Sequence, residues 1–180
     1  MKIQSLRISL LVLIALSWSG CQVVFTNPPA AKLKDDKALR GRWTSAEKEK
    51  EAMTVRFERR NREEVDVSFL PDEPDKKNPV FTAKLFEIGG RSYMVLNPTD
   101  ADRDKGFLIV RYEISGDELA VWILNSEKVA ALIKQKRVAG EGGQSGATVT
   151  ESADNVSRFL QSRDGQDAFE IFGKFRRARS

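Results

Sequence analysis

Apolar and polar residues alternate along much of the chain beyond residue 39, and this period of two constrains the fold more than any other feature. Residues 53–58 and 64–69 each alternate strictly, as expected of strands with one buried face. Only the short segment 59–63 separates them, so we expect these two strands to form a hairpin.

Turn signals divide the next part of the chain in the same way. Gly89-Gly90 separates the strand-like runs 80–88 and 91–97, and two consecutive glycines suit the positive φ angles of a tight hairpin turn. A Ser-Gly-Asp-Glu sequence separates the runs 107–114 and 119–124. Both of these runs have apolar residues on both faces, which predicts central strands or strands covered by a helix.

The period becomes helical after residue 125. Apolar and amphipathic side chains at Val129, Leu132, Ile133 and Lys136 follow the spacing i, i+3, i+4, i+7, which predicts an amphipathic helix over residues 126–137. A second helix is expected farther on, capped by a hydroxyl side chain. Its cap and apolar stripe are Thr150 or Ser152, then Val156, Phe159 and Leu160.

Two segments complete the prediction for the body. The glycine-rich stretch Gly140–Gly146 is expected to be a flexible loop, and the late apolar cluster of Phe169, Ile171, Phe172 and Phe175 is expected to return as a strand or to pack over the sheet. The fold class is therefore mainly β, or β-rich α+β. We expect an antiparallel up-and-down meander that curls into a barrel or half-barrel, with two short helices late in the chain.

The N-terminus has the anatomy of a secretory signal. Lys2 and Arg7 precede an apolar run that is too short to span a bilayer as a helix. Ser19 and Gly20 then precede Cys21, the only cysteine. This arrangement resembles the lipobox of bacterial lipoproteins, although Trp18 stands where Leu is usual. Cleavage after Ser19 with plain secretion, and an uncleaved anchor, are the alternatives.

The lipobox resemblance implies a cellular location and a division of the chain into segments. Residues 1–20 would be the signal peptide, and Cys21 would be the lipid-attachment residue. Because Gln22 rather than Asp follows, the resemblance implies a bacterial outer membrane facing the periplasm. Residues 21–38 are predicted to be the lipidated cysteine with a flexible tether, a short strand through Val23–Phe25 being the alternative. Residues 39–178 would form the domain.

The start of the first strand resembles that of lipocalin-like (calycin) barrels. Its sequence is Leu39-Arg40-Gly41-Arg42-Trp43. In that family the tryptophan plugs the closed end of the barrel, and a basic residue from the last strand often lies across the indole. The resemblance implies that role for Lys174, Arg176 or Arg177.

A longer pattern resembles a bacterial lipoprotein family of unassigned function, over about residues 39–177. It runs from Phe81-x-x-x-Leu85-Phe86-x-Ile88-Gly89-Gly90 through Phe107-Leu108 to Gly116-Asp117-Glu118-Leu119-x-x-x-Ile123-Leu124, followed by a helix. These are hydrophobic and turn residues, so the resemblance bears on fold and location. Two late helices differ from the single late helix of ordinary lipocalins.

Composition excludes much of the usual chemistry. The chain has 180 residues, one cysteine and no histidine, which excludes an internal disulfide, Ser/His/Asp triads and most zinc sites. The formal charge is +4, or +2 once Lys2 and Arg7 of the signal are removed, which is too mild to indicate nucleic acid. Asp100, Asp102 and Asp104 resemble half of a calcium loop but fail the EF-hand pattern. We expect no metal, no cofactor and no catalytic residue.

Three functions remain open. The first is a non-enzymatic binding module that holds an apolar or amphipathic ligand in the barrel mouth. Its candidate residues, for the mouth or the core, are Trp43, Phe57, Tyr93, Tyr112 and Trp122. The second is a structural or interaction lipoprotein whose filled barrel contacts an envelope protein. The third is an enzyme with paired carboxylates, drawn from Glu58, Glu64, Asp66, Glu87 and Glu113. Partners would be the membrane, through the anchor, and a small apolar ligand or an envelope protein.

Overall fold

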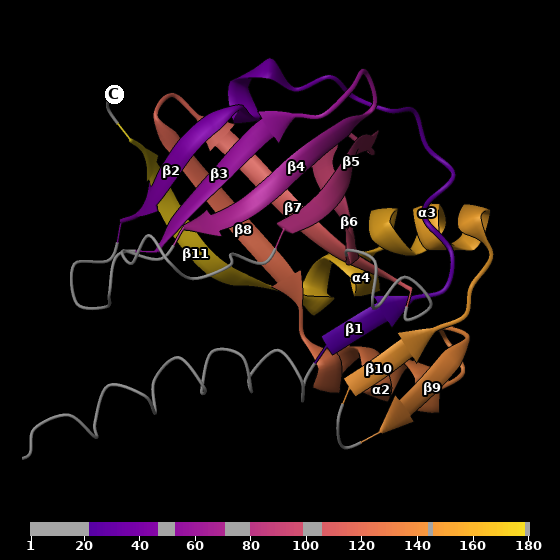
Figure 1. The fold of residues 1–180 in the computed structure, drawn as a ribbon. Coiled ribbons are helices and arrows are strands. Elements are labelled where there is room, and N and C mark those ends of the chain that lie inside the picture. Colours follow the sequence, from indigo (N-terminus) through magenta and orange to yellow (C-terminus); the bar gives the residue numbers. More distant parts are fainter. Residues whose placement is uncertain (1–21, 47–52, 71–79, 99–105, 144–145, 179–180) are drawn as a thin grey trace, which may run out of the picture.

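The computed structural model of the chain describes residues 22–46, 53–70, 80–98, 106–143 and 146–178 (Figure 1). The strands in these ranges are β1 (Gln22–Phe25), β2 (Gly41–Ser45), β3 (Thr54–Arg59), β4 (Glu64–Leu70), β5 (Val80–Ile88), β6 (Arg91–Pro98), β7 (Phe107–Ser115), β8 (Glu118–Leu124), β9 (Gly140–Gly143), β10 (Gly146–Val149) and β11 (Phe169–Arg177). The helices are the 3-10 turn η1 (Lys37–Leu39), α2 (Ser126–Lys134), α3 (Ala153–Gln161) and α4 (Arg163–Ala168).

Eight of the described strands close into an antiparallel barrel. The strands β2 to β8 pair in chain order, and β11 closes the ring by pairing with β8 on one side and with β2 on the other. The predicted meander and its hairpins are confirmed, and the barrel is closed rather than half-open. The late apolar cluster does return as a strand, β11.

Three short strands extend the sheet beyond the barrel. β1 pairs with the start of β7 in antiparallel fashion and with β10 in parallel, and β9 lies along the other edge of β10. The prediction of a flexible tether over this part of the chain is therefore wrong, because Gln22–Phe25 is a strand and the Phe25 side chain is completely buried. The alternative of a short N-terminal strand is the one that the structure shows.

The glycine-rich segment is also more ordered than expected. Gly140–Gly143 is strand β9 rather than loop, and residues 144–145 lie outside the described ranges. A Cβ atom at Gly140 would lie 2.2 Å from the carbonyl oxygen of Thr148. Glycine is required here because β9 lies close against its neighbours, so the composition reflects close packing and not mobility.

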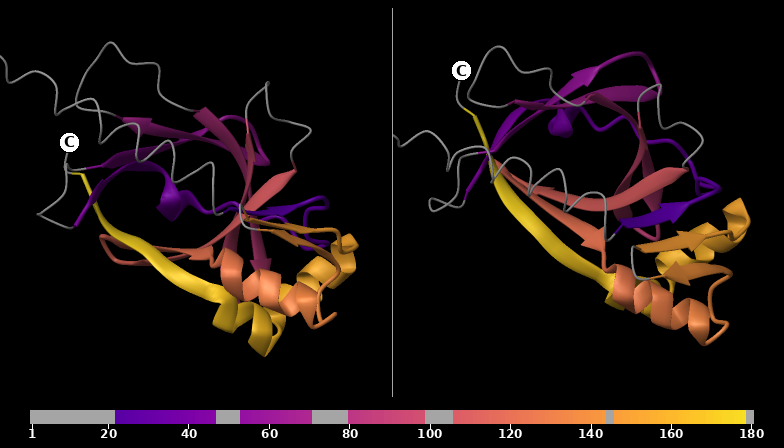
Figure 2. Two further views of the ribbon diagram at one scale, coloured as in Figure 1. Left: turned by 90° about the horizontal axis from the view of Figure 1, so that it is seen from below. Right: turned by 60° about the horizontal axis from the view of Figure 1, so that its bottom comes forward.

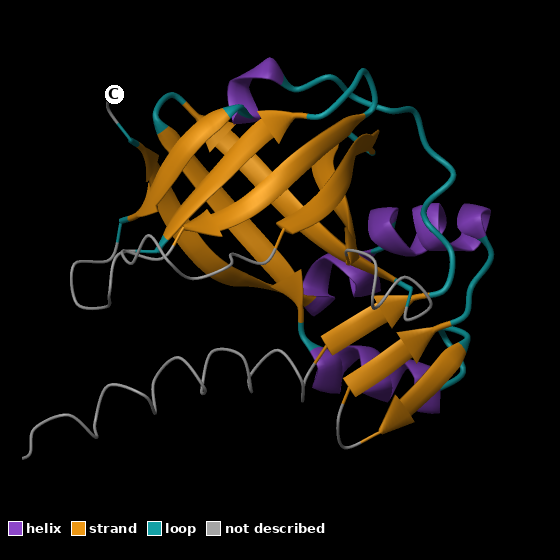
Figure 3. Cartoon of the chain, viewed as in Figure 1, coloured by secondary structure: helices purple, strands orange, loops and turns teal. Residues whose placement is uncertain are grey.

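Part of the wall formed by β5 to β8 is buried on both faces. On β6, Met94 and Leu96 face the barrel interior, whereas Tyr93 and Val95 face a second core outside the barrel. This outer core lies beneath α2, α3 and α4, which gather on one side of the barrel together with β1 and β10 (Figures 2 and 3). Of the two arrangements predicted for the strands at 107–114 and 119–124, central strands or strands covered by a helix, the structure shows the covered one, and the cover extends to parts of β5 and β6.

α3 begins at one of its two predicted caps, Ser152, whereas the cap of α2, Asn125, was not singled out from the sequence. The side chain of Asn125 accepts a hydrogen bond from the amide of Lys128 at the start of α2, and Ser152 caps α3 through the amide of Asn155. α2 ends at Lys134, three residues before the predicted end, and Lys136 has a positive φ of 57°. Within the described part of the chain, no helix reaches the length and apolarity needed to cross a bilayer.

Candidate functional site: a cavity at one end of the barrel

One end of the barrel is closed by η1 and Trp43. The indole is completely buried, its Nε1 donates to the carbonyl oxygen of Leu39 at 2.8 Å, and the guanidinium carbon of Arg177 lies 4.3 Å from the ring centroid. Arg177 also donates to the carbonyl oxygens of Ala38 and Arg40. The expected basic residue over the indole is therefore Arg177, where a cation–π contact contributes about 0.5–2 kcal/mol.

A polar cluster fastens the N-terminal segment to the same end. Tyr112, on the barrel interior, donates from its hydroxyl to Asp36 Oδ2 at 3.0 Å. Lys34 Nζ lies 3.3 Å from the same carboxylate oxygen and 2.7 Å from Ser92 Oγ. Burial, and then the negative charge of Asp36, raises the pKa of Tyr112 well above its ordinary value. The phenol is therefore neutral and serves as a donor.

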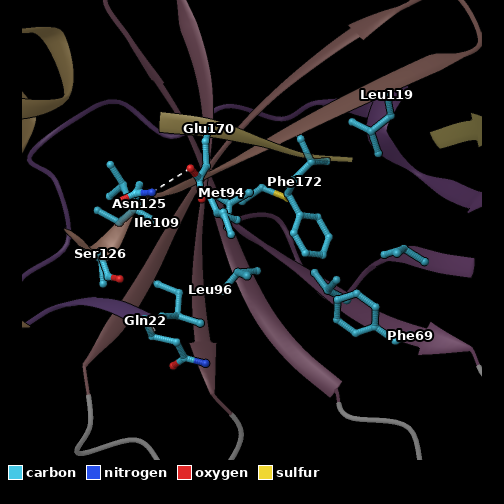
Figure 4. Close-up of a pocket in the computed structure, with 18 of the residues that line it drawn as sticks. Gln22, Phe69, Met94, Leu96, Ile109, Leu119, Asn125, Ser126, Glu170 and Phe172 are labelled. Carbon is cyan, nitrogen blue, oxygen red and sulfur yellow. Dashed lines mark hydrogen bonds between the residues drawn. The ribbon is translucent and has the colours of Figure 1, made fainter. Parts of the chain in front are cut away.

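The opposite end of the barrel contains a cavity of about 460 Å³. Its lining is mostly aliphatic and aromatic, and every barrel strand except β2 and β5 contributes (Figure 4). The buried part of the lining includes Val55, Phe57, Met94, Leu119 and Phe175. A cavity of this size is typical of small-molecule sites, which are concave and largely apolar.

The rim of the cavity is polar on one side. Gln22 of β1, Asn125 and the first two residues of α2, Ser126 and Glu127, line it together with Glu170 of β11. Asn125 Nδ2 donates to Glu170 Oε2 at 2.9 Å (Figure 4). Among the described lining residues, these two glutamates are the only charged side chains.

Apolar side chains are exposed on the other side of this rim. Ile123 is 36% exposed and Phe172 is 41% exposed, and both line the cavity. Ile171 beside them is 52% exposed. Among the residues whose exposure the structure describes, these are the exposed large hydrophobic side chains.

A second hollow lies on the outer surface near the closed end. Arginines dominate its lining: Arg40, Arg42, Arg56, Arg59 and Arg177. Several are already engaged, since Arg40 pairs with Asp35, Arg56 pairs with Glu58, and Arg177 holds the carbonyls beside Trp43. This hollow is polar and open, and it resembles a solvated face more than a built site.

The sequence-predicted ligand residues occupy three different places. Phe57 lines the cavity. Trp43 and Tyr112 belong to the barrel core at the closed end and do not line the cavity. Tyr93 and Trp122 lie on the outer face of the wall, with the outer core.

Tyr93 and Trp122 have a structural role in that outer layer. Tyr93 donates from its hydroxyl to the Leu160 carbonyl oxygen at 3.2 Å and accepts from Gln166 Nε2 at 2.8 Å. Arg111 donates to the Oε1 atom of Gln166 at 2.8 Å, and its guanidinium carbon lies 4.5 Å from the centroid of the Trp122 ring. Burial lowers the pKa of Arg111. These contacts hold α4 against the barrel.

Most of the lining was not singled out from the sequence. Met94, Leu96, Leu119 and Phe172 are part of it, yet each belongs to a run with apolar residues on both faces. Alternation gives no sign of which face is interior in such a run. Gln22 was placed in a tether, and only the alternative of an N-terminal strand could have brought it to the rim.

The strand carboxylates proposed for acid–base work do not reach the cavity. Glu58, Glu87 and Glu113 are exposed, Glu64 and Asp66 are half-buried, and none lines the cavity. The described residues contain no group of three or more side chains suited to holding a metal ion. Asp100, Asp102 and Asp104 lie outside the described ranges, as does Cys21.

Comparisons of the chain with models of known protein families, with curated proteins and with solved structures yield no match. Any functional assignment must therefore come from the residues of this chain and their geometry. The geometry is that of an eight-stranded antiparallel barrel, consistent with a lipocalin-like fold, closed at one end and hollow at the other.

Proposed function

We propose that this chain is a lipid-anchored, non-enzymatic binding protein of the bacterial cell envelope, and that it holds an apolar or amphipathic ligand in the barrel cavity. The observation that carries the ligand-binding proposal is the apolar cavity of about 460 Å³. The resemblance of residues 1–21 to a lipoprotein signal supports the anchor at Cys21. The outer membrane, on its periplasmic side, is the proposed location, and the lipoprotein family of unassigned function is the proposed family.

An apolar chain would gain free energy from this cavity without any special chemistry. Each methylene group moved out of water contributes about 0.8 kcal/mol. The lining offers aliphatic and aromatic contacts from seven strands, and its polar groups are confined to the rim. An amphipathic molecule would therefore place its chain inside and its polar end among Gln22, Asn125 and Ser126.

The alternative of a filled barrel has less support. Side chains such as Trp43 and Tyr112 do fill the closed end, but the volume beside Phe57 and Leu119 is left open. If the barrel served only as a structural support, larger side chains that filled this volume would make it more stable, because side chains around an empty cavity lose packing contacts.

The test is a titration of the mature chain with the neutral, apolar fluorophore N-phenyl-1-naphthylamine. We expect one binding site per chain. Leu108→Trp should weaken binding at least tenfold, which corresponds to about 1.4 kcal/mol, because Leu108 is half-buried, lines the cavity and leaves room for a larger side chain that blocks it.

Lys84→Trp is the matched control, because Lys84 is exposed on the outer face of the same barrel. It should leave binding unchanged, and the melting temperature of both variants should stay close to that of the wild type. Absence of stoichiometric binding by the wild type, or equal weakening by both variants, would reject the cavity as the ligand site.

A further inference from the structure

The anchor site and the cavity are neighbours in the chain. Gln22 lines the rim of the cavity, and consecutive Cα atoms across a trans peptide are about 3.8 Å apart. A lipid on Cys21 would therefore be attached one residue from the rim. β1 holds Gln22 in place through its pairing with β7 and β10, so no flexible tether separates the barrel from a lipid on Cys21.

The exposed apolar residues gather at the same end. Ile123 pairs with Glu170 across β8 and β11, and Trp122 pairs with Ile171, so Ile123, Ile171 and Phe172 are near neighbours. The pairing shifts between Ile171 and Gly173, an irregularity of the kind that redirects side chains at a sheet margin. Single exposed apolar residues are ordinary, but here Ile123 and Phe172 line the mouth of the cavity, and Ile171 lies next to them on the outer face of β11, opposite Trp122.

Charge at this end limits the kind of surface it fits. Glu127 and Glu170 line the rim, and no lysine or arginine in the described lining offsets them. An anionic surface would be repelled, whereas a zwitterionic one would not.

We propose that the open end of the barrel docks on a zwitterionic lipid bilayer, with Ile123, Ile171 and Phe172 entering the interface beside the lipid on Cys21. The mouth of the cavity then faces the bilayer, and an apolar ligand passes between membrane and barrel without crossing water. This inference rests on the anchor in the proposed function. It adds an orientation that the anchor alone does not require.

The experiment places an environment-sensitive fluorophore at one end of the barrel or the other. Cys21 is the only cysteine and its sulfur would be acylated, so Ile171→Cys and Asp117→Cys each provide a unique thiol for labelling. Asp117 is exposed in the turn between β7 and β8, at the closed end. The acylated, labelled chain is reconstituted in phosphatidylcholine vesicles that contain a brominated phosphatidylcholine as quencher.

We expect strong loss of fluorescence from the label at position 171 and none from the label at 117. Replacing a third of the lipid with phosphatidylglycerol should weaken the quenching at 171, because like charges repel at short range in low salt. Equal quenching of both labels would overturn the docked orientation.

A second arm keeps the test independent of acylation. The same labelled chains, with residues 1–21 replaced by a hexahistidine tag, are attached to vesicles that contain a nickel-chelating lipid. Quenching at 171 only, in this arm, supports docking even if Cys21 proves unmodified. Failure of the label at 171 to respond in both arms would reject docking, while the naphthylamine titration would still report separately on the cavity.

Discussion

Tyr112 is a side chain through which the stability of the closed end should depend on pH. Its buried hydroxyl donates to Asp36, and its folded-state pKa is raised above the ordinary value of 10.0. An unfolded chain loses this proton near pH 10, whereas the folded chain keeps it. The contribution of the protonated Tyr112 to the free energy of unfolding is therefore fully present below pH 10, and it decreases as the pH rises above 10.

We expect Tyr112→Phe to change this dependence. At pH 9 the variant should be about 1 kcal/mol less stable than the wild type, because it lacks the hydrogen bond to Asp36. Above pH 10 the wild type should lose about 1.4 kcal/mol per pH unit relative to the variant. Urea unfolding at pH 9 and pH 11 measures both differences. A constant difference across this range would contradict the buried, neutral phenol.

Individual residues were predictable where a local pattern or a resemblance singled them out. The Gly-x-Trp sequence indicated Trp43, and the basic C-terminal run indicated a cation over the indole. Which cation it is depends on register, since Arg177 is the cross-strand partner of Trp43. The shift between Ile171 and Gly173 alters the inward and outward alternation along β11, so no count along the sequence could have selected Arg177 over Lys174 or Arg176.

Among the elements, the packing of α4 against the end of α3 depends on one glycine of α4, Gly165. A Cβ atom on Gly165 would lie 1.9 Å from the carbonyl oxygen of Phe159, and the Gly165 amide donates to Ser162 Oγ at 3.0 Å. Because the clashing atom belongs to the backbone, it cannot move aside as the end of a flexible side chain can. α4 would therefore have to move away from α3, which carries the buried Phe159 and Leu160.

We expect Gly165→Ala to destabilise the protein by about 3 kcal/mol, the upper part of the range for overpacking. Gly143→Ala is the control, because a Cβ atom there meets nothing within 4 Å. Thermal unfolding followed by circular dichroism distinguishes them. Similar melting temperatures for the two variants would show that α4 is not held where the structure places it.

Long strands and capped helices could be predicted from the sequence, and short strands with distant partners could not. The hairpins between β3 and β8 have local partners and clear turn residues. β1, by contrast, has four residues, and its parallel partner β10 lies more than a hundred residues farther along the chain. β9 consists of three glycines and a glutamate, a composition that indicates a loop unless the close approach of its neighbours is known.

For the whole molecule, the decisive pairing is between the first and last strands of the barrel. β2 and β11 meet through residues 43–45 and 175–177, and this contact turns a meander into a closed barrel. Nothing in the sequence of either segment predicts that the two will pair, which is why a barrel and a half-barrel were both expected. Closure leaves the mouth as the route to the cavity, and Gln22 puts the proposed anchor beside it.

We expect Cys21→Ala to abolish incorporation of labelled palmitate and to release the protein from the membrane fraction of the producing cells, because the lipid is the proposed attachment. Gln22→Ala keeps the cysteine and serves as the control, which should still be labelled. Metabolic labelling and fractionation measure both effects. Persistent membrane retention of unlabelled Cys21→Ala protein would contradict the anchor.

Because part of the wall from β5 to β8 is buried on both faces, the barrel is stiffer on that side than on the other. Met94 and Leu96 border the cavity, while Tyr93 and Val95 on the same strand are pressed against the helical layer. This half of the wall cannot bow outward without disturbing a packed core. Arg56 and Glu58 on β3 face solvent instead. A ligand too bulky for the cavity would therefore be accommodated by β3 and β4, so the width of the cavity is fixed from one side and compliant on the other.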